Sequence, residues 1–334
     1  FQAEDGIRDA QESRGLGDVY KRQGVGTALV DIIAQVDDEI IKKLDLNKGS
    51  MSLIEENQIS KIREYFNNPT ITSGGSVCNT IHELSNSSHE ASFFGKVNDD
   101  DYGRAFLKDM EDAKIPFLGI KEKNSLPTGC CNILVTNDGE RTMATHIGIG
   151  SQLSVQDIVK EKFQGVDHVY MEAYLWDHEL TKAALKKVGE LSKELKFELS
   201  FSLSDSFCVM RNRSELEEFI SNNVDLVFCN LEEAKEFSQS EHMSDVAQYF
   251  HHLNKKFVMT SGKEGGYFFH ENKVVHEKAK IVKSVIDTTG AGDNFAAGFL
   301  EKYLLDSPIK ESLENGHQKS SLVIQQLGSR IKRN

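Results

Sequence analysis

The sequence lacks the features that would assign the chain to a membrane or to a nucleic acid. No stretch of its 334 residues approaches the roughly 18 consecutive apolar residues of a membrane-spanning helix, and the N-terminus is without the basic and then apolar pattern of a secretory signal. Acidic residues outnumber basic ones by 52 to 39, and the net charge of −13 gives no basic surface for a nucleic acid or an acidic membrane. A nucleotide is still compatible with this charge, because Mg²⁺ and backbone donors hold phosphates locally.

Cysteine usage indicates a reducing compartment. Disulfides persist in oxidising compartments and are rare in the cytoplasm. The five cysteines are odd in number, are scattered and lack the spacing of metal ligands (Cys78, Cys130, Cys131, Cys208 and Cys229). We therefore expect a cytoplasmic protein.

The order of the apolar segments predicts an α/β fold. Between residues 154 and 286, strand-like and helix-like segments alternate, which is typical of βαβ units in a doubly wound, mostly parallel sheet flanked by helices. In such sheets ligands bind at the carboxyl ends of the strands. Residues 24–334 are interpreted as one domain of this kind. Residues 1–23 have no apolar periodicity and no initiating Met, resemble translated vector or adaptor sequence, and are left outside the fold as a non-native or disordered leader.

One glycine-rich stretch stands before a markedly apolar helical segment. Gly290, Ala291 and Gly292 are small, and Phe295–Leu300 follows as the apolar run. The start of a helix offers unpaired N–H groups and a partial positive charge, so it can hold a phosphate without Lys or Arg. Asp293 in this position suits a general base for an incoming hydroxyl. The alternative is a tight strand-to-helix turn in which Asp293 is the N-cap.

Two further stretches have spacings that suit a ligand site. Paired glycines at Gly74 and Gly75 let the backbone approach a ligand, and Asn79 lies about one turn into the helix that follows. The alternative is a helix capped by Ser76. Asn230 and Glu233 lie one turn apart on one helix face, and the alternative for them is a helix cap with a favourable acid in the first turn.

The string Asp-Thr-Thr-Gly-Ala-Gly-Asp at residues 287–293 resembles the C-terminal signature of the ribokinase family, the PfkB-type carbohydrate and nucleoside kinases. The resemblance implies that Asp293 is the catalytic base and that Gly290, Ala291 and Gly292 form the anion hole. It also implies a ribokinase-like fold with a small β lid, with lid strands from about 27–55 and 120–147, and ATP and Mg²⁺ as cofactors.

The segment Gly-Val-Gly-Thr-Ala-Leu-Val-Asp at residues 24–31 is similar to the opening of adenosine-kinase-like members of this family. Asp31 then corresponds to the carboxylate that accepts hydrogen bonds from two sugar hydroxyls. Thr27 stands where these relatives usually have Asn. The same resemblance places a second group of residues on the other side of the ribose: Gly74, Gly75, Ser76 and Asn79.

The remaining site residues are implied by weaker parts of the resemblance. Arg141, beside the turn of a predicted hairpin, would approach the transferring phosphate, although a solvated Arg next to a turn is the alternative. Asp287 would hold a monovalent cation such as K⁺. Asn230 and Glu233 would organise Mg²⁺ and the triphosphate. The nucleotide would contact Thr260, Gly262, Gly265 and His317, the last of which is alternatively a structural histidine.

Together these resemblances imply an ATP-dependent phosphotransferase that moves the γ-phosphate to a primary hydroxyl. Adenosine, converted to AMP, is the first choice of acceptor. The alternatives are another sugar kinase of the family, acting on ribose, a keto-deoxy sugar acid or another nucleoside, and a catalytically silent ligand sensor on the same fold. The expected partners are small molecules only, and both a monomer and a homodimer stay open.

Overall fold

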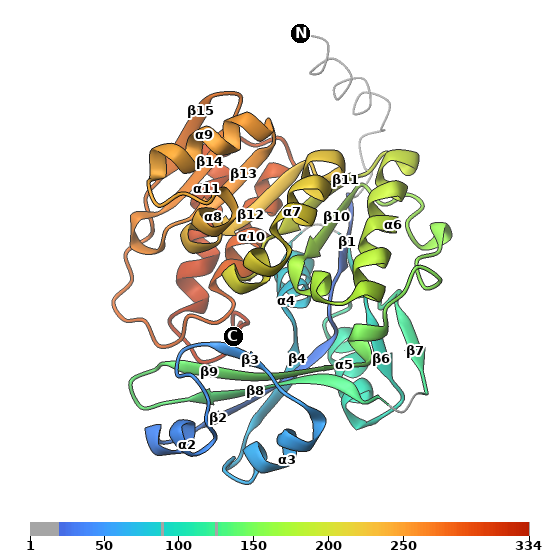
Figure 1. Cartoon of the computed structure of the whole chain (residues 1–334), viewed down its shortest axis with the longest axis vertical. Coiled ribbons are helices and arrows are strands. Elements are labelled where there is room, and N and C mark those ends of the chain that lie inside the picture. The colour runs from blue at the N-terminus through green and yellow to red at the C-terminus, as the bar shows by residue number, and fades with distance from the viewer. Residues whose placement is uncertain (1–19, 88–89, 124–125, 334) are drawn as a thin grey trace.

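The computed structural model describes residues 20–87, 90–123 and 126–333, and within them the largest element is an eight-stranded sheet. Its neighbouring strands are parallel except at one edge, where β14 and β15 run antiparallel. The predicted doubly wound, mostly parallel sheet is thus confirmed (Figure 1). In spatial order the strands are β15 (Lys273–Glu277), β14 (Gly266–His270), β13 (Lys256–Thr260), β12 (Leu226–Asn230), β11 (Glu198–Ser202), β10 (His168–Glu172), β1 (Lys21–Val25) and β5 (Glu90–Phe94).

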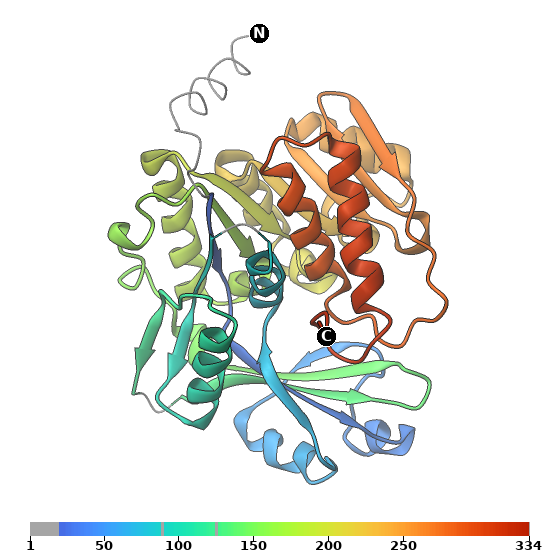
Figure 2. The same ribbon diagram turned by 180° about the vertical axis from the view of Figure 1, so that it is seen from behind.

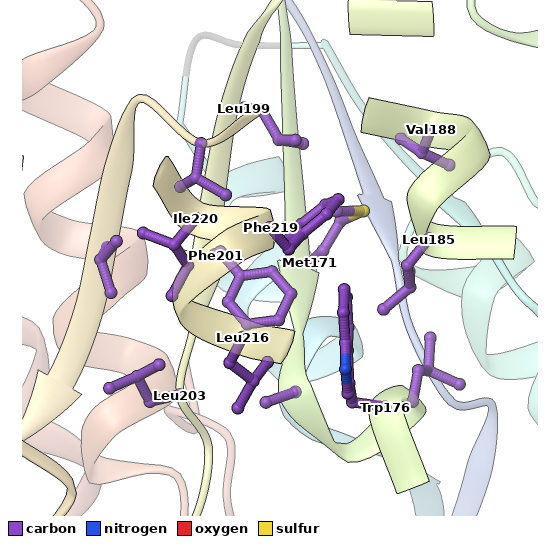
Figure 3. Close-up of a cluster of buried hydrophobic side chains, with 14 of the residues drawn as sticks. Met171, Trp176, Leu185, Val188, Leu199, Phe201, Leu203, Leu216, Phe219 and Ile220 are labelled. Atoms are coloured by element: carbon purple, nitrogen blue, oxygen red, sulfur yellow. The ribbon is translucent and has the colours of Figure 1, made fainter. Parts of the chain in front are cut away.

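Helices cover both faces of this sheet, and each face has its own apolar core. One core packs α6 (Glu179–Leu195), α7 (Ser206–Asn223), α8 (Leu231–Ser238) and α9 (Met243–Leu253) against the sheet. Figure 3 shows part of this core, where the buried Trp176 packs against Phe219 at a ring-centroid distance of 4.7 Å. The second core, seen from behind in Figure 2, contains α4 (Ser76–Ser85), α10 (Ala291–Tyr303) and α11 (Ile309–Val323). None of the helices in the described part of the chain could cross a membrane.

The second layer is a five-stranded sheet that forms the lid. In spatial order it contains β3 (Met51–Leu53), β9 (Arg141–Gly148), β8 (Thr128–Val135), β2 (Leu29–Gln35) and β4 (Thr70–Gly74) among the described residues. A small third core packs the helices α2 (Asp38–Lys43) and α3 (Glu56–Arg63) onto one face of this sheet, which leaves the other face toward the main domain. Figure 1 shows the lid sheet crossing below the carboxyl ends of the central strands.

The lid is joined to the main domain by short elements. β2, β3 and β8 lie inside the ranges expected for lid strands, β9 ends one residue beyond them, and β4 is a further strand that runs from the lid directly into α4. β7 (Ile120–Glu122) pairs with β6 (Lys96–Asn98) in a separate two-stranded sheet next to α5 (Asp101–Asp112). The 3₁₀ turns are η1 (Ile149–Gln152), η2 (Lys160–Lys162), η3 (Ala173–Asp177) and η4 (Gly262–Glu264).

Strand β1 begins earlier than the sequence analysis assumed. Lys21, Arg22 and Gln23 were left outside the fold, yet they pair with β10 and with the edge strand β5, so they lie on an interior strand of the central sheet. Arg22 is 1% exposed and Gln23 is fully buried, and the polar side-chain atoms of both lack hydrogen-bond partners in the described structure. Burial lowers the pKa of Arg22 to about 10. Residues 1–19 of the expected leader lie outside the described residues.

Candidate active site

A cavity of about 460 Å³ lies between the carboxyl ends of the central strands and the inner face of the lid. The ends of β10, β11, β12 and β13 contribute Glu172, Ser202, Asn230 and Thr260 to its wall. The lid contributes a largely apolar surface: Leu29, Met51, Leu53, Ile133, Met143 and Ile147. Ligand sites in doubly wound sheets occur at this edge, so the cavity is the candidate active site.

The loop before α10 has the geometry of an anion hole. Gly290 adopts a left-handed backbone (φ +69°) at the helix N-cap, where a Cβ atom would overlap Ser329. Ala291 N–H donates to the Thr288 carbonyl at 3.2 Å. In the described structure the N–H groups of Gly292 and Asp293 have no recorded acceptor. These two donors at the positive end of a helix are therefore available to an anion. Of the expected members Gly290, Ala291 and Gly292, Ala291 is engaged in the turn, and the Asp293 N–H group was not among those expected.

Asp293 lies in the first turn of α10 and faces the cavity. The N-cap is Gly290, so the alternative of Asp293 as the N-cap is not what the structure shows. Its Oδ1 accepts a hydrogen bond from Ser76 Oγ at 2.7 Å, and its Oδ2 accepts one from Asn79 Nδ2 at 2.9 Å. Burial raises the pKa of Asp293 to about 6, and the two hydrogen bonds oppose this rise. Such a carboxylate is still ionised at neutral pH and is a stronger base than an ordinary aspartate.

Asp31 lines the same cavity from the lid, on strand β2. A Cβ atom on Gly74 would overlap the Asp31 carboxylate, so only glycine allows β4 to pass this close. Burial raises the pKa of Asp31 to about 7, against the opposing effect of Arg330 and Arg141, and the negative charge of Asp293 adds to the rise. The two predicted acids therefore share one cavity, which the proposed chemistry requires.

The loop before β2 and the start of α4 are joined by Glu172, a residue to which the sequence analysis assigned no role. Gly75 has φ +101°, and a Cβ atom there would overlap the Thr27 carbonyl. Glu172 is 1% exposed at the end of β10. Its Oε1 accepts from Thr27 N–H at 2.7 Å and its Oε2 accepts from Val77 N–H at 3.0 Å. Glu172 thus joins the two ligand-facing loops. In the sequence, Glu172 could have been identified as a candidate site residue, because it is an acid at the carboxyl end of an apolar strand.

Asn230 and Glu233 bond to each other in a reciprocal capping box at the start of α8. Glu233 N–H donates to Asn230 Oδ1 at 2.9 Å, while Asn230 N–H and Nδ2 donate to the Glu233 carboxylate at 3.0 and 2.6 Å. The helix-cap alternative is therefore realised, and both side chains also line the cavity. Burial raises the pKa of Glu233 to about 7, and the charges of Asp205 and Asp293 contribute. Oxygen donors such as these are what Mg²⁺ prefers, but the described residues contain no group of three or more acids, histidines or cysteines that could hold a metal ion alone, so phosphate oxygens and water would have to complete the coordination.

The predicted nucleotide residues are only partly brought together. Thr260 lines the cavity at the end of β13. Gly262 and Gly265 have φ +50° and +109° in the η4 turn behind it, and a Cβ atom on Gly265 would overlap the Glu277 carbonyl. His317 is not among the described residues that line the cavity. Its Nε2 hydrogen-bonds the Glu277 carbonyl at 3.2 Å, and its ring contacts Phe295 edge-on. These contacts are those of a structural histidine, which was the alternative interpretation.

Asp287 has partners other than a monovalent cation. It is 1% exposed and forms an ion pair with Arg141 of the lid. The same carboxylate accepts hydrogen bonds from the N–H groups of Thr289 at 2.9 Å and Gly328 at 2.6 Å. These donors satisfy the charge for which K⁺ was expected, so the structure gives no support to the K⁺ prediction. Arg141 lines the cavity, and its Nε and Nη1 atoms have no partner within the described residues.

Comparison with known proteins agrees with this geometry. The family model described as pfkB family carbohydrate kinase matches residues 51–333. The chain belongs to this family. As a PfkB-type kinase it has a ribokinase-like fold, and its solved relatives include adenosine kinase from Sinorhizobium meliloti (32% identity, TM-score 0.87, 94% of this chain and 96% of that chain). A probable sugar kinase protein from Rhizobium etli CFN 42 has a similar score: it is 31% identical, with a TM-score of 0.89, and the match covers 94% of this chain and 96% of that chain. Adenosine kinase 2 of Arabidopsis thaliana is 26% identical over 328 residues, 91% of this chain and 94% of the relative.

Proposed function

We propose that this PfkB-type kinase transfers the γ-phosphate of ATP to the 5′-hydroxyl of adenosine and so forms AMP. One observation carries the proposal: Asp293 and Asp31 line a single cavity, one beside the free N–H groups that open α10 and the other on the lid. An acceptor held through its sugar hydroxyls by Asp31 would direct a further hydroxyl toward Asp293. We place this reaction in the cytoplasm, because all five cysteines are free and buried.

Each residue has a distinct task in the proposed reaction. Asp293 accepts the proton of the attacking hydroxyl, which contributes about 10²- to 10⁴-fold. The N–H groups of Gly292 and Asp293 hold the transferring phosphoryl group, whose charge develops on its outer oxygens in a loose transition state. Arg141 lines the cavity and would bring its positive charge toward the same phosphoryl group. Asn230 and Glu233 would hold Mg²⁺, which would neutralise part of the negative charge of the triphosphate.

The lid favours a nucleoside over a free sugar as the acceptor. Its cavity face presents Leu29, Met51, Leu53, Ile133 and Met143. An apolar surface of this size stabilises a planar base by removing it from water, whereas a free pentose would leave it uncovered. Thr145 and Cys131 lie on the same lid face and would meet the ring nitrogens, while the charged lid residues Asp31, Glu140 and Arg141 line the cavity as well. The adenosine kinase of Sinorhizobium meliloti supports the same choice.

A sugar kinase is the second candidate, favoured by the similarity to the probable sugar kinase of Rhizobium etli. A substrate panel separates the candidates: ATP consumption is measured with adenosine, other nucleosides, ribose and a keto-deoxy sugar acid. We expect the highest kcat/KM with adenosine. A higher value with ribose or the sugar acid would replace adenosine as the substrate, and no turnover with any acceptor would favour the silent sensor.

A further inference from the structure

The C-terminal segment 327–333 passes behind the anion hole and is held from several sides. Gly328 N–H donates to the Asp287 carboxylate at 2.6 Å. Arg330 forms an ion pair with Asp109 of α5 and donates to the Ser73 carbonyl at 2.7 Å. Arg333 forms an ion pair with Glu83 of α4 at 2.6 Å. The segment is thus fixed between helices of the main domain and the end of lid strand β4.

Ser329 is the member of this segment that reaches the site. It is 2% exposed. Its Oγ donates to Asn79 Oδ1 at 3.1 Å, and its carbonyl accepts from Asn294 Nδ2 at 2.8 Å. Asn79 in turn donates through Nδ2 to Asp293 Oδ2 at 2.9 Å. A continuous chain of hydrogen bonds therefore leads from Ser329 through Asn79 to Asp293.

The direction of these hydrogen bonds is fixed by chemistry. An ionised carboxylate only accepts, so Asn79 has to turn its amide nitrogen toward Asp293. The flipped amide would place Oδ1 against the carboxylate, where two acceptors repel each other. The Ser329 hydroxyl donates to Oδ1 and so stabilises the orientation in which the amide nitrogen faces Asp293. Without this hydroxyl, the buried Oδ1 loses a partner and the amide loses its orientation.

We propose that Ser329 is a positioning residue for the general base, acting through the orientation of the Asn79 amide. The inference rests on the proposed function, in which Asp293 accepts the proton. It adds the C-terminal segment, which no sequence motif assigned to the site, to the elements that set the base.

The surroundings of Asp293 make the Asn79 donor important. The titratable groups that interact with Asp293 from the neighbouring elements are acids or phenols: Asp31 of β2, Tyr170 and Glu172 of β10, Tyr174 of η3 and Glu233 of α8. The charge of Asp293 raises the pKa of each of these groups. Burial disfavours the ionised form of Asp293 itself, and the hydroxyl of Ser76 and the amide of Asn79 favour it. A misplaced Asn79 amide therefore raises the pKa of Asp293, and the acid limb of the pH–rate profile moves to higher pH.

The test is a double-mutant cycle in the full chain, with Ser329→Ala, Asn79→Ala and both together. We expect Ser329→Ala to lower kcat by about 2- to 10-fold, the size of one hydrogen bond, and to shift the acid limb upward. In the Asn79→Ala background the same change should have no further effect, because its target is gone. Equal losses in both backgrounds, or an unmoved acid limb, would overturn the proposal. The matched control is Arg333→Ala, which removes another contact of the same segment without touching Asn79.

A second measurement separates this inference from the proposed function. The carboxyl carbon of Asp293 is titrated by NMR in the wild-type chain and in Ser329→Ala, which needs no turnover. We expect a higher pKa in the variant and an unchanged pKa in Arg333→Ala. An unchanged pKa of Asp293 in Ser329→Ala refutes the positioning role of Ser329 even if the enzyme phosphorylates adenosine. A raised pKa of Asp293 in Ser329→Ala, together with no phosphorylation of any acceptor by the wild-type chain, supports the positioning role of Ser329 and refutes the proposed function.

Discussion

At the scale of single residues, Asp293 combines two properties that rarely occur together. It is buried enough for its pKa to rise to about 6, yet Ser76 and Asn79 stabilise its ionised form. We expect Asp293→Asn to lower kcat by about 10²-fold or more, because the amide cannot accept the proton. Steady-state kinetics with adenosine and ATP measure this. Asp112→Asn, at an exposed acid of α5, is the control, and near-normal turnover of Asp293→Asn would remove it as the base.

The same pKa predicts how activity depends on pH. Because both the base and the sugar-binding Asp31 must be ionised, we expect kcat/KM for adenosine to fall with falling pH, first through about 7 as Asp31 is protonated and then through about 6 as Asp293 is protonated. A profile of kcat/KM for adenosine from pH 4.5 to about 8 tests this. A limb near the ordinary aspartate value of about 4 would mean that the carboxylate is solvated rather than buried.

Asp31 links acceptor binding to stability. Its pKa is raised from 3.8 to about 7, so the folded state holds the proton more tightly than the unfolded state. Ionising Asp31 therefore destabilises the folded state. This loss of stability is absent at a pH below the pKa of the unfolded state, develops as the pH rises from about 4 to 7, and is complete above pH 7. We expect Asp31→Asn to raise the melting temperature at pH 8 but not at pH 3.5, and to raise KM for the acceptor far more than KM for ATP.

The Asp31→Asn prediction is checked by thermal unfolding at both pH values and by steady-state kinetics, with Asp112→Asn as the exposed control. Equal rises in KM for both substrates would refute the sugar-binding role of Asp31. A melting temperature that rises equally at both pH values would show that the effect is unrelated to ionisation.

At the scale of elements, the lid and the anion-hole loop are joined by one ion pair. Arg141 starts β9, and Asp287 precedes the turn into α10. We expect Arg141→Ala to lower kcat by about 10²-fold, similar to the loss of an oxyanion-hole donor, and to destabilise the chain because it leaves a buried charge without its partner. Arg141→Ala with Asp287→Asn should recover stability but not kcat. Full recovery of kcat would assign Arg141 a structural role, and Arg104→Ala is the exposed control.

The elements also show where prediction from sequence succeeded and where it stopped. The glycine-rich strings marked the starts of α4 and α10, because close approach and left-handed backbone demand glycine at Gly75 and Gly290. The lid strand β4 was missed because its one apolar residue, Ile71, is exposed and its buried residues are Ser73 and Gly74, so it has no alternation of apolar and polar residues. The partners Ser329 and Glu172 were also missed, because they act through contacts between segments more than 90 residues apart, which no local spacing encodes.

At the scale of the whole molecule, one interior strand of the central sheet contains two poorly accommodated residues. Arg22 and Gln23 of β1 are buried between β10 and β5 without hydrogen-bond partners for their polar atoms in the described structure. Central strands of a parallel sheet are normally apolar on both faces. No apolar run precedes Gly24 in the sequence, which is why residues 21–23 were left outside the fold.

This conflict predicts that the sheet can be stabilised without affecting the site. Arg22→Leu replaces an unpaired buried guanidinium by an apolar group, and leaving such groups unpaired costs about 1–3 kcal/mol. We expect urea unfolding at pH 7 to show a gain of this size with kcat unchanged, because the ligand-facing residues begin only beyond the end of β1. Lys21→Leu, at the exposed start of the same strand, should have little effect. A loss of stability in Arg22→Leu would mean that the cation–π contact with Tyr20, at 5.5 Å, outweighs the desolvation of the guanidinium.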